Sequence, residues 1–251
     1  MTTSRHSAVS NAGALVREWR QRRRLSQLEL SMRADVSTRH ISYVESGKSQ
    51  PSREMLLNLA EHLDIPLREC NQLLLAGGFA PKYTGDRIDD DRLEIVRNVV
   101  RTVLRGHEPN PAFAIDRRWN LVDANGAAQA LFANVDPDLL AGPVNIARVS
   151  LHPRGLARQI INLGECRAHL LRRLQRELTA TGDEALRELR DEVMSYRYDR
   201  PLEDVESHDF ALPVRLRTSE GEQAYVSTIT TFGTPRDIAV EELVIESFYP
   251  I

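Results

Sequence analysis

Near its N-terminus the chain carries two helix patterns joined by a tight turn, and this feature constrains its fold more than any other. Ser26, followed three positions later by Glu29, has the spacing of a capping box, which satisfies two backbone N–H groups at a helix start. A turn is predicted at Asp35, and Ser37 can cap the next helix, which ends at Gly47. Short helices gain most of their stability from packing, so further helices must cover them.

The second of these helices has one apolar and one polar side. Ile41 and Val44 fall on the apolar side at helical spacing. The polar side carries four side chains able to hydrogen-bond to base edges: Thr38, Arg39, Ser42 and Tyr43. A short helix with such an outer face suits the major groove of DNA. A helical hairpin that only packs is the alternative, and the agreement of caps, motif and helix count favours the DNA reader.

Residues 12–78 resemble the phage-repressor-like helix-turn-helix domains of the XRE class. Ser26-Gln27 at the start of the motif and Glu45-Ser46-Gly47-Lys48 at its end carry the resemblance. It implies an all-α domain of five helices, base contacts from the four polar side chains named above, and a pair between Arg20 and Glu45. It also implies that Gln27 contacts a phosphate. The further phosphate contacts that we expect come from Ser26, Lys48 and Ser49.

Length and composition predict a two-domain globular protein. The chain has 251 residues, of which 41% are hydrophobic and 27% charged, and no apolar run approaches the length of a membrane span. Residues 1–80 hold 11 Lys and Arg against 8 Asp and Glu, a balance of +3, whereas the remainder holds 22 against 28, a balance of −6. This asymmetry is expected when only one domain meets DNA phosphates, although a chance scatter of solvated charge gives the same counts.

The N-terminus lacks the apolar segment of a secretory signal, and the two cysteines, Cys70 and Cys166, fall in different predicted domains. A disulfide framework is therefore not expected. We expect a cytoplasmic, nucleoid-associated protein without membrane insertion.

The predicted boundaries are a disordered N-terminus at 1–11, the helix-turn-helix domain at 12–78, a linker with a connecting helix at 79–110, and a second domain at 111–251. The connecting helix, expected at 89–105, carries a valine stripe at Val96, Val99, Val100 and Val103. This stripe can pack on the second domain or on a second subunit, and the sequence leaves both open.

The second domain shows two strand patterns, then helices, then three strand patterns. Strands are predicted at 112–116, 120–124, 210–216, 223–232 and 240–249, with a short helix at 126–133 and a helical half at 145–197. This order predicts an α+β domain in which helices cover an antiparallel sheet. The stretch 113–132 resembles the opening of a PAS-type domain. Such sheets place their third strand on an edge, where Pro213 is tolerated.

A repressor-like domain followed by this sheet domain resembles the MmyB-like transcription regulators, with most weight on residues 151–177. The resemblance implies dimeric DNA binding and a hydrophobic pocket for a fatty-acid-like ligand. The apolar side chains expected to line it are Phe113, Ile115, Leu121, Phe132, Leu170, Leu174, Val214, Val226 and Phe232. The polar candidates are His152, Asn162 and Arg167. A filled core is the alternative, and a cavity of several hundred Å³ would favour the ligand.

No catalytic motif is present: the sequence has no Gly-rich phosphate loop, GxSxG or HExxH. We therefore expect neither an enzyme nor a cofactor. Cys166, His169 and His152 could form a metal site, but a buried thiol and two ordinary histidines are favoured. The arginine-rich stretch 167–176 is interpreted as the solvated face of a helix.

Three functional hypotheses follow from this sequence. The first is a regulator that responds to a hydrophobic ligand and binds a palindromic operator as a homodimer. The second is a DNA-binding protein whose second domain only dimerises or binds a protein partner. The third is an enzyme with a DNA-binding domain, which the missing motifs make the weakest.

Overall fold

The computed structural model describes residues 5–85, 90–199, 202, 212–218 and 221–251, with side chains from Ala12 onward. The chain forms two compact units. The first is built on the chain up to Gly85 and includes Arg236–Ile238, and the second is built on the rest. None of the helices in the described part of the chain is long and apolar enough to cross a membrane.

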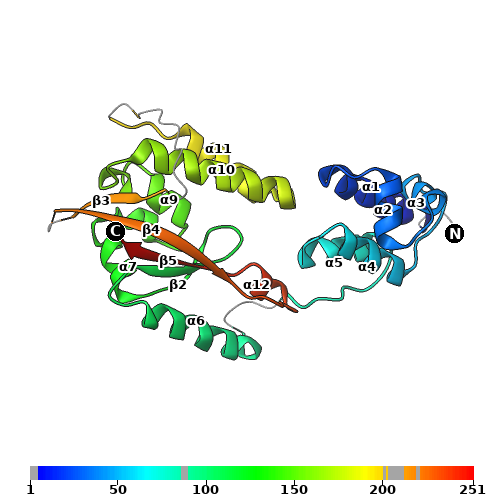
Figure 1. Ribbon diagram of the computed structural model, residues 1–251, viewed down its shortest axis with the longest axis horizontal. Helices are drawn as coiled ribbons and strands as arrows, with labels where there is room; N and C mark the ends of the chain where they lie inside the picture. The colour runs from blue at the N-terminus through cyan, green and yellow to red at the C-terminus, as the bar shows by residue number, and fades with distance from the viewer. Residues whose placement is uncertain (1–4, 86–89, 200–201, 203–211, 219–220) are drawn as a thin grey trace. The chain divides into compact units, whose positions relative to one another are not determined.

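The first unit is all-helical, as predicted (Figure 1). Its five helices are α1 (Arg5–Arg22), α2 (Gln27–Ala34), α3 (Thr38–Glu45), α4 (Arg53–His62) and α5 (Leu67–Ala76). One apolar core joins them, and Leu30, Ile41, Leu59 and Leu73 within it are wholly buried. This core supplies the apolar cover that the short motif helices need.

The predicted caps of the motif are confirmed. Ser26 Oγ accepts from the Glu29 N–H at 3.1 Å, and Glu29 Oε2 accepts from the Ser26 N–H at 2.7 Å, so the capping box is complete. Asp35 ends α2 in the left-handed region with φ 53°, and Ser37 Oγ accepts from the His40 N–H to start α3. The chain can thus reverse direction within three residues.

Helix α1 is assigned from Arg5, inside the segment 1–11 for which we expect disorder. On α2, Leu28 is 57% exposed whereas Leu30 is wholly buried. Two positions on a helix lie about 200° apart, so only Leu30 faces the core.

The second unit is an α+β domain with one antiparallel sheet, as predicted. Its strands are β1 (Ala112–Ile115), β2 (Leu121–Ala124), β3 (Val214–Thr218), β4 (Gly221–Thr231) and β5 (Val244–Pro250), in the spatial order β2-β1-β5-β4-β3. Its helices are α6 (Glu94–Gly106), α7 (Gly126–Leu131), α8 (Pro137–Leu140), α9 (Ile146–Leu151), α10 (Leu163–Thr181), α11 (Glu184–Ser195) and α12 (Ile238–Glu241). Strand β3 lies at the edge and follows Pro213, as expected for a PAS-type sheet.

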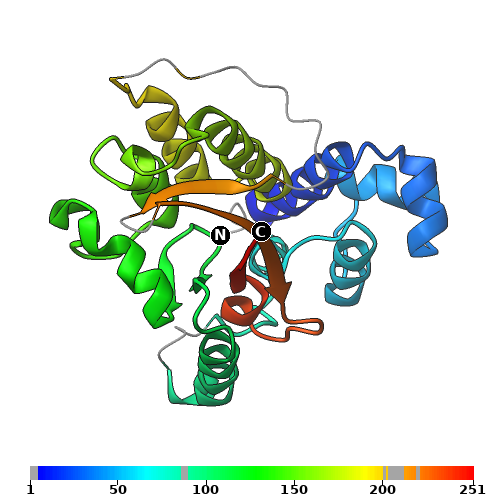
Figure 2. The ribbon, with the colours of Figure 1, turned by 60° about the vertical axis from the view of Figure 1, so that its left-hand side comes forward.

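Helices cover both faces of this sheet. Helix α6 lies on one face, and α9, α10 and α11 lie on the other (Figures 1 and 2). Val100 and Leu104 of α6 are buried against Ala112, Ala114 and Ile245 of the sheet. The sequence left open whether the valine stripe packs on the second domain or on a second subunit. Val100 packs on the second domain.

Loops cover both edges of the sheet. The Ile161 N–H donates to Arg215 O, and the Arg217 N–H donates to Gln159 O, both at 2.8 Å, along β3. At the opposite edge the Leu121 N–H donates to Val144 O at 2.7 Å. Covered edges protect a sheet from pairing with another chain.

The C-terminal strand begins later than predicted, at Val244, because residues from Ile238 to Glu241 form the short helix α12. The third strand is predicted from residue 210 and begins at Val214, and residues 210 and 211 lie outside the described residues.

Candidate functional site

The first candidate site is the outer side of α3. Ile41 and Val44 are buried, while Arg39 and Tyr43 are exposed and Thr38 and Ser42 are half-buried. The helix thus presents its four predicted base-contacting residues opposite its apolar side. Thr38 has a structural contact as well, because its Oγ1 lies 2.9 Å from the Oγ of Ser31 on α2.

Tyr43 holds the side chain of Arg39. Arg39 Nε donates to the Tyr43 hydroxyl at 3.1 Å, and its guanidinium carbon lies 5.2 Å from the ring centroid. Lys48 Nζ lies 5.9 Å from the same ring. Among the described residues no hydrogen-bond partner holds the terminal guanidinium nitrogens of Arg39, so both can donate to the edge of a guanine.

A buried ion pair fixes the end of α3. Arg20 Nε and Nη2 donate to the two carboxylate oxygens of Glu45 at 2.6 and 2.8 Å, so the predicted pair is confirmed. The Glu45 side chain is only 3% exposed, and its hydrogen bond raises the pKa of Arg20 despite burial. Gln27 Nε2 donates to Glu45 Oε2 at 2.8 Å, which occupies one amide hydrogen and leaves the other for a phosphate.

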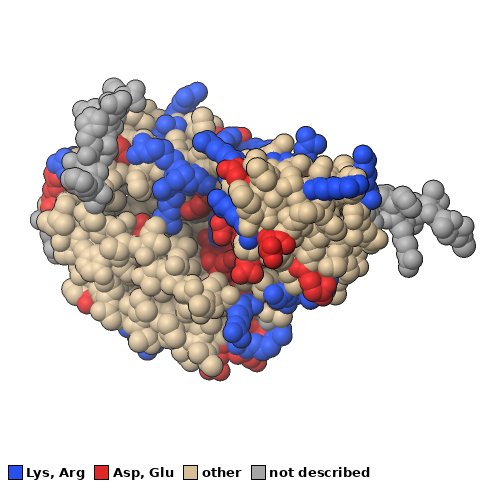
Figure 3. All heavy atoms as spheres, turned by 45° about the vertical axis from the view of Figure 1, so that its right-hand side comes forward, with Lys and Arg blue, Asp and Glu red and all other residues tan. Residues whose placement is uncertain are grey.

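The predicted phosphate contacts differ in exposure: Ser26 and Lys48 are exposed, and Gln27 and Ser49 are half-buried. The arginines that end α1 are held within the unit. Arg23 donates to the backbone oxygens of Leu63 and Asp64, and Arg22 pairs with Glu18. Figure 3 shows Lys and Arg side chains interspersed with Asp and Glu on the face that it draws.

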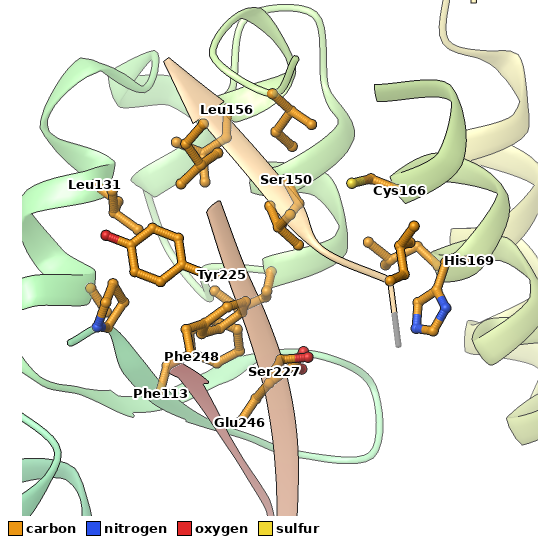
Figure 4. A pocket seen from close by; sticks show the side chains of 18 of the residues that line it. Phe113, Leu131, Ser150, Leu156, Cys166, His169, Tyr225, Ser227, Glu246 and Phe248 are labelled. Atoms are coloured by element: carbon orange, nitrogen blue, oxygen red, sulfur yellow. The ribbon is translucent and has the colours of Figure 1, made fainter. Parts of the chain in front are cut away.

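The second candidate site is a partly enclosed cavity of about 110 Å³ between the sheet and the helices of the second unit (Figure 4). Its wall is mainly apolar: Phe113, Trp119, Leu131, Phe132, Ile146, Leu156, Ile160, Leu170, Leu212, Val214, Leu216 and Phe248 contribute to it. The volume exceeds the roughly 10–15 Å³ that one water needs. The cavity volume is below the several hundred Å³ that we set as the criterion for a ligand pocket. The cavity therefore does not meet this criterion.

Four of the predicted apolar residues line the cavity: Phe113, Phe132, Leu170 and Val214. Ile115, Leu121 and Leu174 belong to the surrounding core instead, and Leu174 is wholly buried. Val226 was placed on the wrong face of β4, because its neighbours Tyr225 and Ser227 line the cavity and strand side chains alternate. Phe232 packs on the α6 side of the sheet.

None of the three predicted polar candidates lines the cavity. His152 Nδ1 accepts from the Arg154 N–H, and its ring packs edge-on against Tyr196. Asn162 Nδ2 donates to Pro213 O at 2.8 Å and thereby ties α10 to the start of β3. Arg167 Nη2 donates to Met194 O at 2.9 Å.

The polar wall comes from residues that sequence reasoning missed. Arg173 is buried, and its Nη1 donates to Glu246 Oε2 at 2.9 Å. Its Nε donates to Glu177 Oε1 at 3.2 Å, and its guanidinium lies 4.3 Å from the Trp119 ring. Trp119 Nε1 donates to Glu177 Oε2 at 2.7 Å. Two features of the sequence could have indicated this polar wall. One is the i,i+4 spacing of Arg173 and Glu177, and the other is the carboxylate of Glu246 between Val244 and Phe248.

His169 and Cys166 also line the cavity. Burial, followed by the charge of Arg172, lowers the pKa of His169, and burial raises the pKa of the Cys166 thiol to about 12. Within the described ranges, no group of three His, Cys, Asp or Glu side chains could hold a metal ion. Cys166 and Cys70 are both buried.

Two family models match the chain. Residues 16–70 match the helix-turn-helix family, and residues 96–251 match the MmyB-like transcription regulator ligand binding domain. The chain belongs to the MmyB-like transcription regulators. This member is therefore a DNA-binding transcription regulator with a ligand-binding domain, and neither family is one of enzymes.

Solved structures that are similar to parts of this MmyB-like regulator include a gene regulator, a controller protein and a PAS domain. The clp gene regulator ClgR from Corynebacterium glutamicum is 22% identical over 28% of this chain and 88% of that chain, with a TM-score of 0.25. The restriction-modification controller protein C.AhdI from Aeromonas hydrophila is 32% identical over 25% of this chain and 94% of that chain, with a TM-score of 0.24. The PAS domain of an HTR-like protein from Haloarcula marismortui is 10% identical over 64% of this chain and 95% of that chain, with a TM-score of 0.27. No curated protein matches the chain.

Proposed function

We propose that this regulator binds a palindromic operator as a homodimer and that a hydrophobic small molecule in the cavity alters its DNA binding. The expected ligand classes are fatty acids and acyl derivatives. The observation that carries the proposal is the partly enclosed apolar cavity in the ligand-binding domain of a chain that also carries a helix-turn-helix motif.

The outer side of α3 supports the DNA part of the proposal. One recognition helix covers only a few base pairs, so specific binding by such domains normally uses two copies on half-sites about one helical turn apart, or a multiple of this. Arg39 is the side chain best placed to read a guanine, because Tyr43 leaves its terminal nitrogens available. The phosphates that flank the contacted bases would be held by Ser26, Gln27, Lys48 and Ser49.

The composition of the cavity wall supports the ligand part. A chain of methylene groups gains about 0.8 kcal/mol for each group that it buries, and a narrow apolar space fits such a chain. Pockets for drug-sized ligands are typically about 300–1,000 Å³, so a cavity of about 110 Å³ favours a slim chain over a bulky ring system. The ligand would act by binding one DNA-binding state more tightly than the other.

A second candidate function, dimerisation or partner binding by the second domain alone, has its own supporting observation. Ile95 and Val99 of α6 are 78% and 43% exposed, whereas Val100 and Leu104 of the same helix are buried. An apolar strip that the described part of the chain leaves exposed suits a subunit contact.

Native mass spectrometry of protein purified from cells tests the ligand proposal, with spectra taken before and after extraction by organic solvent. We expect a bound mass that extraction removes, and a Leu170→Trp variant purified in parallel should lack it because the indole would fill the cavity. A wild-type protein that carries no extractable molecule and is not stabilised by any lipid would favour the second candidate function.

The dimer is tested separately, by sedimentation of the protein alone and of its complex with a selected duplex. Two copies on each duplex are expected. A single copy on a duplex that is bound with full specificity would contradict the dimer and the palindrome together.

A further inference from the structure

We propose that Glu246 selects ligands whose polar end donates hydrogen bonds, such as an alcohol, amide or amine at the end of an apolar chain, over free carboxylates. The proposal rests on the proposed ligand function of the cavity and narrows it to a class of head group.

Glu246 is a carboxylate in an otherwise apolar row of the sheet. It lies on β5, the central strand, and its cross-strand neighbours are Phe113 on β1 and Ile229 on β4. Val244 and Phe248 flank it two positions away, on the same face. Its side chain is 13% exposed, and Figure 4 shows it at the wall of the cavity near Ser227. Placing a charged group there costs stability, which points to a role in binding.

Arg173, the cation beside Glu246, also binds other groups. Arg173 donates to Glu246 at 2.9 Å and to Glu177 at 3.2 Å, and it stacks on Trp119. Two carboxylates thus share one guanidinium, which leaves an excess of negative charge and of hydrogen-bond acceptors at this wall. His169 lies at the same border, and partial burial lowers its pKa, which favours the neutral form.

The position of Glu246 coincides with the mouth of the cavity. Beyond it lies an open groove, and five residues line both spaces: His169, Arg173, Leu212, Ser227 and Glu246. A chain that fills the apolar cavity therefore brings its polar end to this shared border. Arg176 also lines the groove, but it is exposed, so water and salt weaken its attraction for an anion.

The border therefore fits a donor better than an anion. Glu246 Oε1 and Ser227 Oγ can accept hydrogen bonds from a ligand, and neither atom has a hydrogen-bond partner among the residues that the structure describes. A carboxylate at the same point would lie beside the Glu246 carboxylate, and like charges repel strongly where water is partly excluded.

A head-group series at one chain length tests the proposal near neutral pH. Dissociation constants are measured for the carboxylate, primary amide, alcohol and amine, by displacement of a fluorescent apolar probe. In the wild-type protein we expect the amide and the alcohol to bind on the order of tenfold more tightly than the carboxylate. Equal or tighter binding of the carboxylate would overturn the proposal while leaving the cavity's ligand function intact.

Variants identify the residue responsible. Glu246→Gln removes the charge and keeps the shape, so the preference should shrink to within about twofold. Glu222→Gln is the matched control: it removes one charge from an exposed pair with Arg215 on the same sheet, outside the cavity, and should leave the preference unchanged. A preference that persists in Glu246→Gln would overturn the assignment. If Glu246→Gln does not fold, the wild-type series still decides the head-group preference. Failure of all four head groups at every chain length would overturn both this inference and the ligand function.

Discussion

Arg20 on α1 and Glu45 at the end of α3 form a two-bond ion pair, with Nε–Oε1 at 2.6 Å and Nη2–Oε2 at 2.8 Å. Arg20 also donates to the Leu25 backbone oxygen at 2.8 Å, so one guanidinium joins α1, the loop before α2 and the recognition helix. Gln27 binds the same carboxylate. The angle at which α3 is presented thus depends on a single buried acid.

Glu45→Gln should destabilise the first unit. The neutral amide cannot accept both guanidinium bonds, and a buried Arg20 loses its counter-charge. We expect a loss of about 1–3 kcal/mol, seen as a lower Tm in thermal unfolding, with weaker binding to all DNA. Glu18→Gln removes the exposed partner of Arg22 on the same unit and should change stability by no more than about 0.5 kcal/mol. Equal effects of the two substitutions would refute a special role for the buried pair.

Arg39→Ala should lower affinity for the specific site by about 1–3 kcal/mol and relax one base position, measured by titration against a panel of single-base variants of the duplex. Tyr43→Phe keeps the ring under Arg39 but removes the hydroxyl that accepts from Nε. It should give a smaller loss at the same base position. A loss at a different position would show that Tyr43 reads a base itself.

Gln27→Ala provides the contrast to Arg39→Ala. Phosphate contacts carry no sequence information, so this substitution should weaken binding to specific and random duplexes alike. If Arg39→Ala also weakens both equally, the outer side of α3 does not read sequence.

The free energy of unfolding should depend on pH through Asp183. It caps α11, and its carboxylate lies 3.2 Å from Arg118 Nε with a side chain only 8% exposed. Burial alone would raise the pKa of Asp183, but the hydrogen bonds from Arg118 and from the Ala185 N–H outweigh it and lower the pKa. A lowered folded-state pKa means that the stabilisation is present above the ordinary Asp pKa of about 4 and is lost as the pH falls through the folded-state value.

Asp183→Asn keeps a good N-cap and removes the charge, so the variant should be about 1 kcal/mol less stable than wild type at neutral pH. Urea unfolding at a series of pH values should show this difference closing as the medium becomes more acidic than about pH 4. A difference that stays constant across the series would mean that the ion pair does not contribute.

Chain length should govern ligand binding in the cavity. In a thermal-shift series of acyl compounds with one head group, Tm should rise with each added methylene until the cavity is full, because each buried group gains about 0.8 kcal/mol. Leu170→Trp, which fills the space, should abolish the rise, whereas Leu121→Met in the adjoining core should preserve it. A rise that survives in Leu170→Trp would place the ligand elsewhere.

The first unit could be predicted closely because its determinants are local. Caps at Ser26 and Ser37 follow from residue type and spacing alone, and both are present. What escaped prediction depends on contacts between helices. Gly13 is an example: a Cβ there would collide with the Val44 backbone oxygen, so the close approach of α1 to α3 requires glycine. Nothing in the local sequence marks this position.

The cavity could be predicted only in part, because its wall is assembled from segments far apart in the chain. The alternation of side chains along a strand indicates which residues share a face, but not which face meets the helices. Val226 on β4 was misplaced for this reason. Arg173 was interpreted as solvated because its neighbours Arg172 and Arg176 are charged, and those two are indeed exposed. Only the opposing Glu246, 73 positions away, explains its burial.

The affinity for a selected operator duplex, measured with and without the acyl compound that stabilises the protein most, shows whether the cavity controls DNA binding. We expect the compound to change the dissociation constant of the wild-type protein by at least about fivefold and to leave that of Leu170→Trp unchanged. An operator affinity that is the same in both conditions, at a compound concentration that saturates the wild-type cavity by thermal shift, would contradict this expectation.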